Sequence, residues 1–357
     1  MPKQPPLLID GHLDLAMNAL YLNRDLRQSI ATLRTSETGK SGSGLGAGTV
    51  TFPELRAANI GLCFVTVLAR TNPEGTSFLD FGTREIAYAH AQGQLAWYRE
   101  HARQGDLTIV TNQKELAAHL AAWDRDPAGT PLGVILTMEG ADPVVDPEQL
   151  PLWFADGLRI LSLAHYGPSG WAHGTHTEGG LKGRAVELLQ AMSHLGIGLD
   201  VTHLCDQSFW EALDNFQGVV LATHSNSRTL VPNDRQFADD QLRELIRRDA
   251  VIGAVLDAWM LQPNWIKGET TATVTLEAVV DQIDHVCQLA GNADHAAIGS
   301  DLDGGYGTEQ VPADLDTIAD LQRIPELLAK RGYGDANIEA IMHGNWTRLL
   351  KRLLPAG

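Results

Sequence analysis

The sequence predicts an α/β fold in which eight parallel strands, each followed by a helix, close into a distorted (β/α)₈ barrel (TIM barrel). Short runs of Val, Ile and Leu alternate along the chain with longer amphipathic segments, as strands alternate with helices. The runs are nearly continuous rather than alternating in polarity, which is typical of strands buried on both faces of a parallel sheet. Eight such units favour a closed barrel, and the 357 residues exceed the about 250 of a typical barrel.

The predicted elements follow one another from the N-terminus to the C-terminus. The strands are expected at 7–10, 62–68, 132–138, 158–164, 197–202, 219–223, 251–256 and 296–299. Helices are expected at 84–104, 183–195, 239–248, 276–289 and 336–353. A further short run, 107–110, does not fit the count of eight, and we expect it to form an accessory strand outside the barrel.

The residues in excess of a minimal barrel are expected in loop insertions of a single catalytic domain spanning 1–357. The insertion near 34–49 is rich in Gly, Ser and Thr, which is typical of a loop. Two further insertions are expected near 168–181 and 260–273. The sequence contains neither an internal repeat nor an interdomain linker.

Composition and charge exclude several classes of function. A content of 44% hydrophobic and 20% charged residues excludes a disordered chain. The net charge of −17 argues against nucleic acid or an anionic membrane as the main partner. No apolar run reaches the about 18 residues of a membrane-spanning helix. Three widely separated cysteines and the lack of a signal-peptide pattern lead us to expect a cytoplasmic protein.

Polar side chains gather at the carboxyl ends of the predicted strands, where (β/α)₈ barrels carry their catalytic residues. Seven of the eight strands end in His, Asp or Glu, and the residues concerned are His12 and Asp14, Glu139, His165, His203, His224, Asp257 and Asp301. A single histidine at a strand end is more often a hydrogen-bonded rim residue than a metal ligand. The combined pattern therefore carries the prediction of a metal site.

The predicted ligand set is typical of zinc. His12 and Asp14 are two residues apart and face the same side of an extended strand. Imidazole and carboxylate groups are ordinary zinc ligands, and His203 and His224 add two imidazoles from neighbouring strands. Glu139 could place one oxygen on each of two metal ions. Two cations held about 3.5–4 Å apart can bind a bridging hydroxide and stabilise a tetrahedral transition state.

Six motifs at these strand ends resemble the membrane (renal) dipeptidase family, which comprises zinc peptidases of the amidohydrolase superfamily. The motifs are 10–14 (Asp-Gly-His-Leu-Asp), 138–140 (Met-Glu-Gly), 161–165 (Leu-Ser-Leu-Ala-His), 200–203 (Asp-Val-Thr-His), 223–225 (Thr-His-Ser) and 299–304 (Gly-Ser-Asp-Leu-Asp-Gly). The likeness extends from about residue 7 to the final helix near Asn345 and Trp346. It implies a distorted (β/α)₈ barrel of the metal-dependent hydrolase type.

The resemblance also implies a cofactor of two Zn²⁺ ions per chain. His12 and Asp14 would bind one ion and His203 and His224 the other, and Glu139 would bridge them together with a hydroxide. The implied reaction is hydrolysis of a dipeptide that has a free C-terminal carboxylate, by attack of this hydroxide. L-Xaa-D-Xaa dipeptides are among the implied substrates.

The remaining site residues take their roles from the same resemblance. Asp301 would hold the bridging water and carry its proton to the leaving amine, and His165 would polarise the scissile carbonyl. Arg235 would bind the C-terminal carboxylate of the substrate, a role that suits a guanidinium group. Arg228 is a competing candidate for that role. A surface salt bridge is the structural alternative for either arginine.

Two departures from renal-type members leave the preferred side chains of the substrate open. Leu13 stands where those members have Asn, and the segment around Asp257 and Trp259 lacks their aromatic hydroxyl. The rival hypotheses are a lactonase, amidase or phosphoesterase on the same barrel, a metal-loaded binding subunit, and a barrel that binds no metal. The expected partner is a small dipeptide, and the family favours a homodimer.

Overall fold

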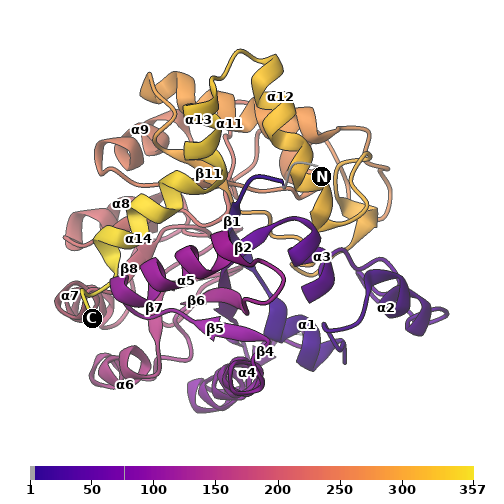
Figure 1. Ribbon diagram of the computed structural model, residues 1–357. Coiled ribbons are helices and arrows are strands. Elements are labelled where there is room, and N and C mark those ends of the chain that lie inside the picture. The colour runs from indigo at the N-terminus through magenta and orange to yellow at the C-terminus, as the bar shows by residue number, and fades with distance from the viewer. Residues whose placement is uncertain (1–4, 76) are drawn as a thin grey trace.

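The computed structural model describes residues 5–75 and 77–357, so residues 1–4 and 76 of the predicted domain lie outside the described residues. Eight parallel strands of the described chain follow one another around the sheet (Figure 1). In sheet order they are β10 (Ile252–Ala254), β11 (Ala296–Ile298), β1 (Leu8–Leu13), β2 (Ile60–Val67), β6 (Leu132–Met138), β7 (Leu158–Ser162), β8 (Gly198–Asp200) and β9 (Val220–Leu221). An isolated parallel bridge between Ala222 and Ile252 joins the two ends of this order and closes the barrel. The predicted fold class is confirmed.

The accessory strand is also confirmed. β5 (Leu107–Ile109) pairs with the first half of β6 in parallel, with Leu107 opposite Leu132, and lies off the path of the barrel. β7 pairs with the second half of β6, where Leu136 lies opposite Leu158. A separate two-stranded sheet, β3 (Arg70–Thr71) with β4 (Asp80–Phe81), lies in the connection after β2.

Helices surround the strands, as Figure 1 shows. They are α1 (Leu15–Tyr21), α2 (Ile30–Ser36), α3 (Phe52–Ala57), α4 (Arg84–Gln104), α5 (Gln113–Arg125), α6 (Leu150–Ala155), α7 (Ala185–Leu195), α8 (Asp206–Asn215), α9 (Asp239–Arg247), α10 (Ala258–Leu261), α11 (Leu276–Ala290), α12 (Ile324–Lys330), α13 (Asp335–Glu339) and α14 (Asn345–Leu353). Short 3₁₀ helices lie at Pro147–Gln149, Thr308–Gln310 and Ile318–Arg323. Within the described chain, no helix combines the length and apolar character needed to cross a bilayer.

The longest helix shows why the sequence pattern located its ends. α4 begins after Thr83, whose side chain accepts a hydrogen bond from the backbone N–H of Ile86. It ends at Gly105, which takes a left-handed conformation with φ of 87° that favours glycine. The final predicted helix, by contrast, is divided in three, because a π-helical turn over Ala340–Gly344 separates α13 from α14.

α14 fills the end of the barrel opposite the predicted site. Its Trp346 and Leu350 pack in one cluster with inward-facing side chains of the strands, including Ile9 and Ile135. The Trp346 indole N–H donates to the Ile298 carbonyl over 2.8 Å. Gly11 on β1 permits this approach, because a Cβ at that position would lie 2.5 Å from the indole ring. The carboxyl ends of the strands are therefore the end that remains available for a site.

A buried ion-pair network holds the loop after α2 against the barrel. Arg24 pairs with Glu37 over 2.8 Å and with Asp303 over 3.3 Å. The same guanidinium donates to the Gly44 carbonyl over 2.7 Å. Asp303 in turn accepts from the backbone N–H of Thr49 over 2.7 Å. Because Asp303 follows β11, these contacts also fix the segment that carries Asp301.

Candidate metal centre

The carboxyl ends of the barrel strands bring the predicted ligands together. Each ligand lies at the end of a strand or in the first residues after it, and each is at most 4% exposed. The set consists of His12 and Asp14 from β1, Glu139 from β6, His203 from β8 and His224 from β9. Because the strands are parallel, the side chains that follow them reach the same end of the barrel.

Glu139 lies at the centre of this cluster. Its Oε1 is 2.9 Å from Nε2 of His203 and 3.3 Å from Nε2 of His224, whereas its Oε2 is 3.6 Å from Nε2 of His12. His12 Nε2 is also 3.7 Å from Asp14 Oδ2. The two carboxylate oxygens therefore face two different groups of ligands.

These contacts define two candidate metal positions that share Glu139. One combines Glu139 with His12 and Asp14, and the other combines it with His203 and His224. In each group the potential ligand atoms lie within 4.8 Å of one another.

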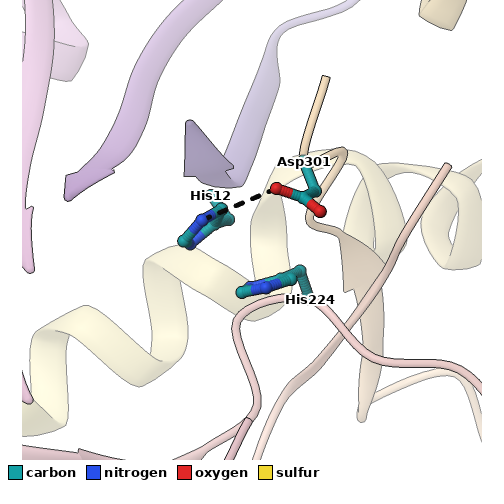
Figure 2. A group of neighbouring side chains, drawn as sticks. All are labelled: His12, His224 and Asp301. Atoms are coloured by element: carbon teal, nitrogen blue, oxygen red, sulfur yellow. Dashed lines mark ion pairs between the residues drawn. The ribbon is translucent and has the colours of Figure 1, made fainter. Parts of the chain in front are cut away.

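Asp301 adjoins both positions without belonging to either. Its Oδ1 is 3.7 Å from His12 Nε2, and it forms a further potential metal-binding group with His12 and His224. Figure 2 shows the Asp301 carboxylate directed toward the His12 ring, with the His224 ring next to it. The two imidazole rings are 3.8 Å apart between centroids.

The backbone at two of these residues is held in a conformation that residues with a Cβ rarely adopt. His203 has φ of 70° and Asp301 has φ of 56°, both in the left-handed region. Such conformations persist where surrounding contacts enforce them, and they are frequent at functional sites.

Hydrogen bonds behind the histidines orient their rings. His203 Nδ1 lies 3.0 Å from Oγ1 of Thr175, whose hydroxyl donates to the His203 carbonyl over 3.3 Å. His224 Nδ1 lies 2.9 Å from Oγ1 of Thr223, which donates to Asp200 over 2.6 Å. Each hydroxyl can donate its proton to that carbonyl or carboxylate oxygen and accept from an Nδ1–H group of the histidine. With Nδ1 protonated in this way, Nε2 of each ring would face Glu139 in the tautomer that binds a metal.

The cluster concentrates ionisable groups with little access to solvent. Burial raises the pKa of Glu139 to about 7, and burial also raises the pKa of Asp301 well above its usual range. Burial disfavours the charged form of His12, but the carboxylates of Glu139, Asp14 and Asp301 outweigh it and raise the pKa of His12 to about 10. Several buried carboxylates in one place repel one another unless a positive charge lies between them, and a proton or a metal ion can supply that charge.

Unpaired polar atoms indicate that a metal fits. Nε2 of His12 and Oδ1 of Asp14 are buried, and among residues 5–75 and 77–357 neither has a hydrogen-bond partner. A buried polar atom left unpaired costs about 1–3 kcal/mol, so such atoms mark a place where a ligand is expected. Three imidazoles and two carboxylates are also the donor set that zinc prefers.

His165 lies beside the cluster as a neutral imidazole. Its Nε2 is 3.7 Å from Glu139 Oε1, and its ring contacts His203 edge-on at 4.4 Å between centroids. Burial lowers the pKa of His165 well below its usual value, and the nearby charges of Arg70 and Arg235 act in the same direction. A neutral imidazole in this place can donate one hydrogen bond to a bound carbonyl oxygen.

The two candidate arginines differ in their surroundings. Arg235 is 3% exposed and donates to the His224 carbonyl over 2.9 Å and to the Ser225 hydroxyl over 3.2 Å. Within the described chain, no carboxylate lies within 4.0 Å of its guanidinium. Arg228 instead forms a two-pronged pair with Asp206 at 2.7 and 2.9 Å. Arg235 therefore places a buried charge, without an ion-pair partner in the described chain, near the candidate metal ligands.

Asp257 reaches the same end of the barrel but stands apart from the candidate metal positions. Both of its oxygens accept from the Gln310 side chain over 2.9 Å. Burial raises the pKa of Asp257 to about 7.

Sequence reasoning did not single out the residues that orient the histidines. Thr175 lies in a predicted loop insertion and meets His203 only in the folded chain, so no spacing signals its role. Asp200 accepts from the Thr223 hydroxyl behind His224. Its importance could have been found by comparison with Asp10, which begins the motif of the first strand. Asp10 accepts from the His12 N–H over 3.1 Å, and Asp200 accepts from the Thr202 N–H over 3.0 Å.

The closed parallel barrel and the buried ligand cluster at its carboxyl end define a metal-dependent hydrolase. The model of the membrane dipeptidase family, peptidase family M19, matches residues 3–354. The chain therefore belongs to this family of metallo-dipeptidases, as the sequence motifs predicted.

Several known proteins and solved structures are similar to this chain. A protein from the pqqA 5′ region of Klebsiella pneumoniae is 29% identical over 62% of this chain and 82% of its own length. The dipeptidase tcpJ of Claviceps purpurea is 28% identical over 55% of this chain, and this chain spans 45% of that protein. A metallopeptidase of Rhodobacter sphaeroides shares the fold with a TM-score of 0.79 and 22% identity over 98% of this chain and 100% of that one. Its structure holds a phosphinate mimic of the dipeptide L-Ala-D-Ala.

Proposed function

We propose that the protein is a binuclear zinc dipeptidase that hydrolyses dipeptides with a free C-terminal carboxylate, L-Xaa-D-Xaa dipeptides among them. The observation that carries the proposal is the position of Glu139, whose two oxygens face two separate groups of ligands. Family membership supports the reaction. The dipeptide mimic bound by the Rhodobacter metallopeptidase supports the substrate class.

Five residues of this chain would hold the metal. His12 and Asp14 would bind one zinc ion, His203 and His224 the other, and Glu139 both. Two zinc ions bound in this way would lower the pKa of water toward neutrality and so would supply the nucleophile for amide hydrolysis.

The other residues would bind the substrate and move protons. Arg235 would bind the C-terminal carboxylate, because its buried charge lacks a carboxylate partner within the described chain. His165 would donate a hydrogen bond to the oxygen of the scissile carbonyl as negative charge develops there. Asp301 would hold a proton and deliver it to the departing amine, a role to which the raised pKa of a buried carboxyl is suited.

A panel of dipeptides tests this proposal. The zinc-loaded protein is incubated with L-Ala-L-Ala and L-Ala-D-Ala, with C-amidated and N-acetylated forms of each as controls, and amino-acid release is measured. We expect cleavage of at least one free dipeptide and loss of cleavage on C-amidation. Zinc binding without release of amino acid from any free dipeptide would overturn the proposal and direct the search to lactones, other amides and phosphoesters.

A further inference from the structure

A cavity of about 350 Å³ lies next to the metal centre. His165 and Gly140 form the wall that faces the metal ligands, and Arg70 and Thr71 of β3 form another. His165 therefore lines the cavity and also lies 3.7 Å from Glu139. A ligand bound at the metal centre could extend past His165 into this space.

The cavity is basic although the chain as a whole carries a net charge of −17. Arg70, Arg84 and Lys182 all line it. Asp142 also lines it and accepts from the backbone N–H groups of Thr71 and Gly170 over 2.8 and 2.9 Å. Burial raises the pKa of this carboxyl against the charges of Arg84 and Lys182, which lower it, so one negative charge faces three positive ones in the cavity.

Two of the three cations have neutral partners. Arg84 donates to the Val145 carbonyl over 3.0 Å, and Lys182 donates to the Ser169 carbonyl over 2.7 Å. Among residues 5–75 and 77–357, no carboxylate lies within 4.0 Å of either charged group. The guanidinium of Arg84 also stacks over Trp171 at 4.6 Å, which holds it in place.

Two hydrogen-bond donors of β3 lack a partner within the described chain. Arg70 pairs with Asp80 through one terminal nitrogen over 2.7 Å. Its Nε and the Thr71 hydroxyl are buried, and within the described chain neither has a hydrogen-bond partner. Arg70 lines the same cavity as His165, whose ring lies 3.7 Å from Glu139, so its guanidinium lies on the side of the cavity shared with the metal centre.

We propose that this cavity is a subsite for an acidic side chain of the dipeptide, an Asp or Glu side chain whose carboxylate binds Arg70 and Arg84. The inference rests on the proposed function, because it assigns a substrate class to the same site. Guanidinium groups suit a carboxylate, and a charged pair in a partly buried pocket favours it over a neutral group of equal size. The acidic residue can be the first or the second of the dipeptide, and the experiment distinguishes the two.

Four dipeptides of matched size form the test. L-Glu-L-Ala is compared with L-Gln-L-Ala, and L-Ala-D-Glu with L-Ala-D-Gln, by kcat/KM of the zinc-loaded protein. If the protein cleaves none of them, the same pairs are compared by binding calorimetry. We expect kcat/KM for one acidic dipeptide to exceed kcat/KM for its amide counterpart by about tenfold or more, because a charge-assisted hydrogen bond is worth that much. The pair that shows the preference identifies the position of the acidic residue.

Variants assign the preference to the cavity. Arg70→Gln and Arg84→Gln should each reduce the ratio of kcat/KM for the acidic dipeptide to kcat/KM for its amide counterpart toward one. Arg99→Gln, on the same helix as Arg84 but paired with Asp156 at the surface, should leave the ratio unchanged.

Equal kcat/KM for the acidic and amide dipeptides with the unmodified protein would overturn the subsite while leaving the dipeptidase proposal intact. A preference that survives both cavity variants would overturn it as well. If no dipeptide is cleaved, the proposed function fails, and calorimetry still decides whether the cavity selects a carboxylate.

Discussion

At the scale of single residues, the charge of Arg235 gives the sharpest test of substrate binding. Arg235→Gln should lower kcat/KM for dipeptides with a free carboxylate by about 10- to 100-fold, mostly through KM, because a charge-assisted pair is lost. Steady-state kinetics on free and C-amidated dipeptides measures the effect. Arg228→Gln is the matched control, since Arg228 is occupied by Asp206, and it should change kcat/KM less than about threefold. A large fall in kcat/KM for Arg228→Gln together with no change for Arg235→Gln would show that Arg228, and not Arg235, binds the substrate carboxylate.

The hydroxyl behind His203 gives a second residue-scale prediction. Thr175→Val removes the acceptor of the His203 Nδ1–H group while keeping the size of the side chain. Partners of this kind fix the tautomer of a metal-binding histidine, so zinc affinity should fall by about 10- to 100-fold. Chelator competition measures the affinity. Thr177→Val, in the same loop but bonded to the Gly174 carbonyl, should have little effect. Equal affinities in the two variants would contradict the role of Thr175.

The residue scale also shows what the sequence can and cannot predict. The clustering of His12, Glu139 and His224 could be predicted, because the strand ends meet at one end of a barrel whatever conformation the loops take. Thr175 and Arg70 could not, because each reaches the site from a loop or a small strand whose path depends on tertiary packing. Arg235 could be proposed only through the resemblance to a family.

At the scale of elements, α14 completes the barrel by inserting Trp346 among the strands. Trp346→Ala should destabilise the protein by about 3–5 kcal/mol, because the cavity left in a packed interior cannot fully collapse. Denaturant unfolding of the zinc-free protein measures the change. Trp210→Ala is the matched control on α8, where the side chain is 36% exposed, and it should cost less than half as much. Similar losses in both variants would contradict the role of α14 in filling the barrel.

The elements themselves were predicted with uneven success for physical reasons. The eight strands and α4 agree closely with the sequence pattern, because buried apolar runs and helix caps are local signals. The division of the last helix was not predicted, because its π-helical turn leaves the apolar pattern of the segment intact. The insertion of α14 into the barrel depends on Gly11 opposite Trp346, a contact between the two ends of the chain.

At the scale of the whole molecule, metal binding should be linked to pH. Without metal, the pKa of His12 is about 10 and that of Glu139 about 7, so near neutrality the cluster holds protons that zinc must displace. Zinc affinity should therefore rise with pH between about 6 and 8, by about tenfold per pH unit for each proton released. Calorimetry in buffers of different ionisation enthalpy counts the protons. An affinity that is constant over this range would contradict the ionisation state described here.

The most direct test of the central claim is a zinc titration of the metal-free protein in which bound metal and dipeptide cleavage are measured together. The account predicts that two zinc ions bind per chain and that the rate of cleavage of L-Ala-D-Ala or an acidic dipeptide reaches its maximum only when both are bound. It also predicts that Glu139→Gln lowers both the amount of bound zinc and the rate of cleavage. Full activity with one zinc ion per chain, or an unimpaired Glu139→Gln variant, would contradict a centre bridged by Glu139.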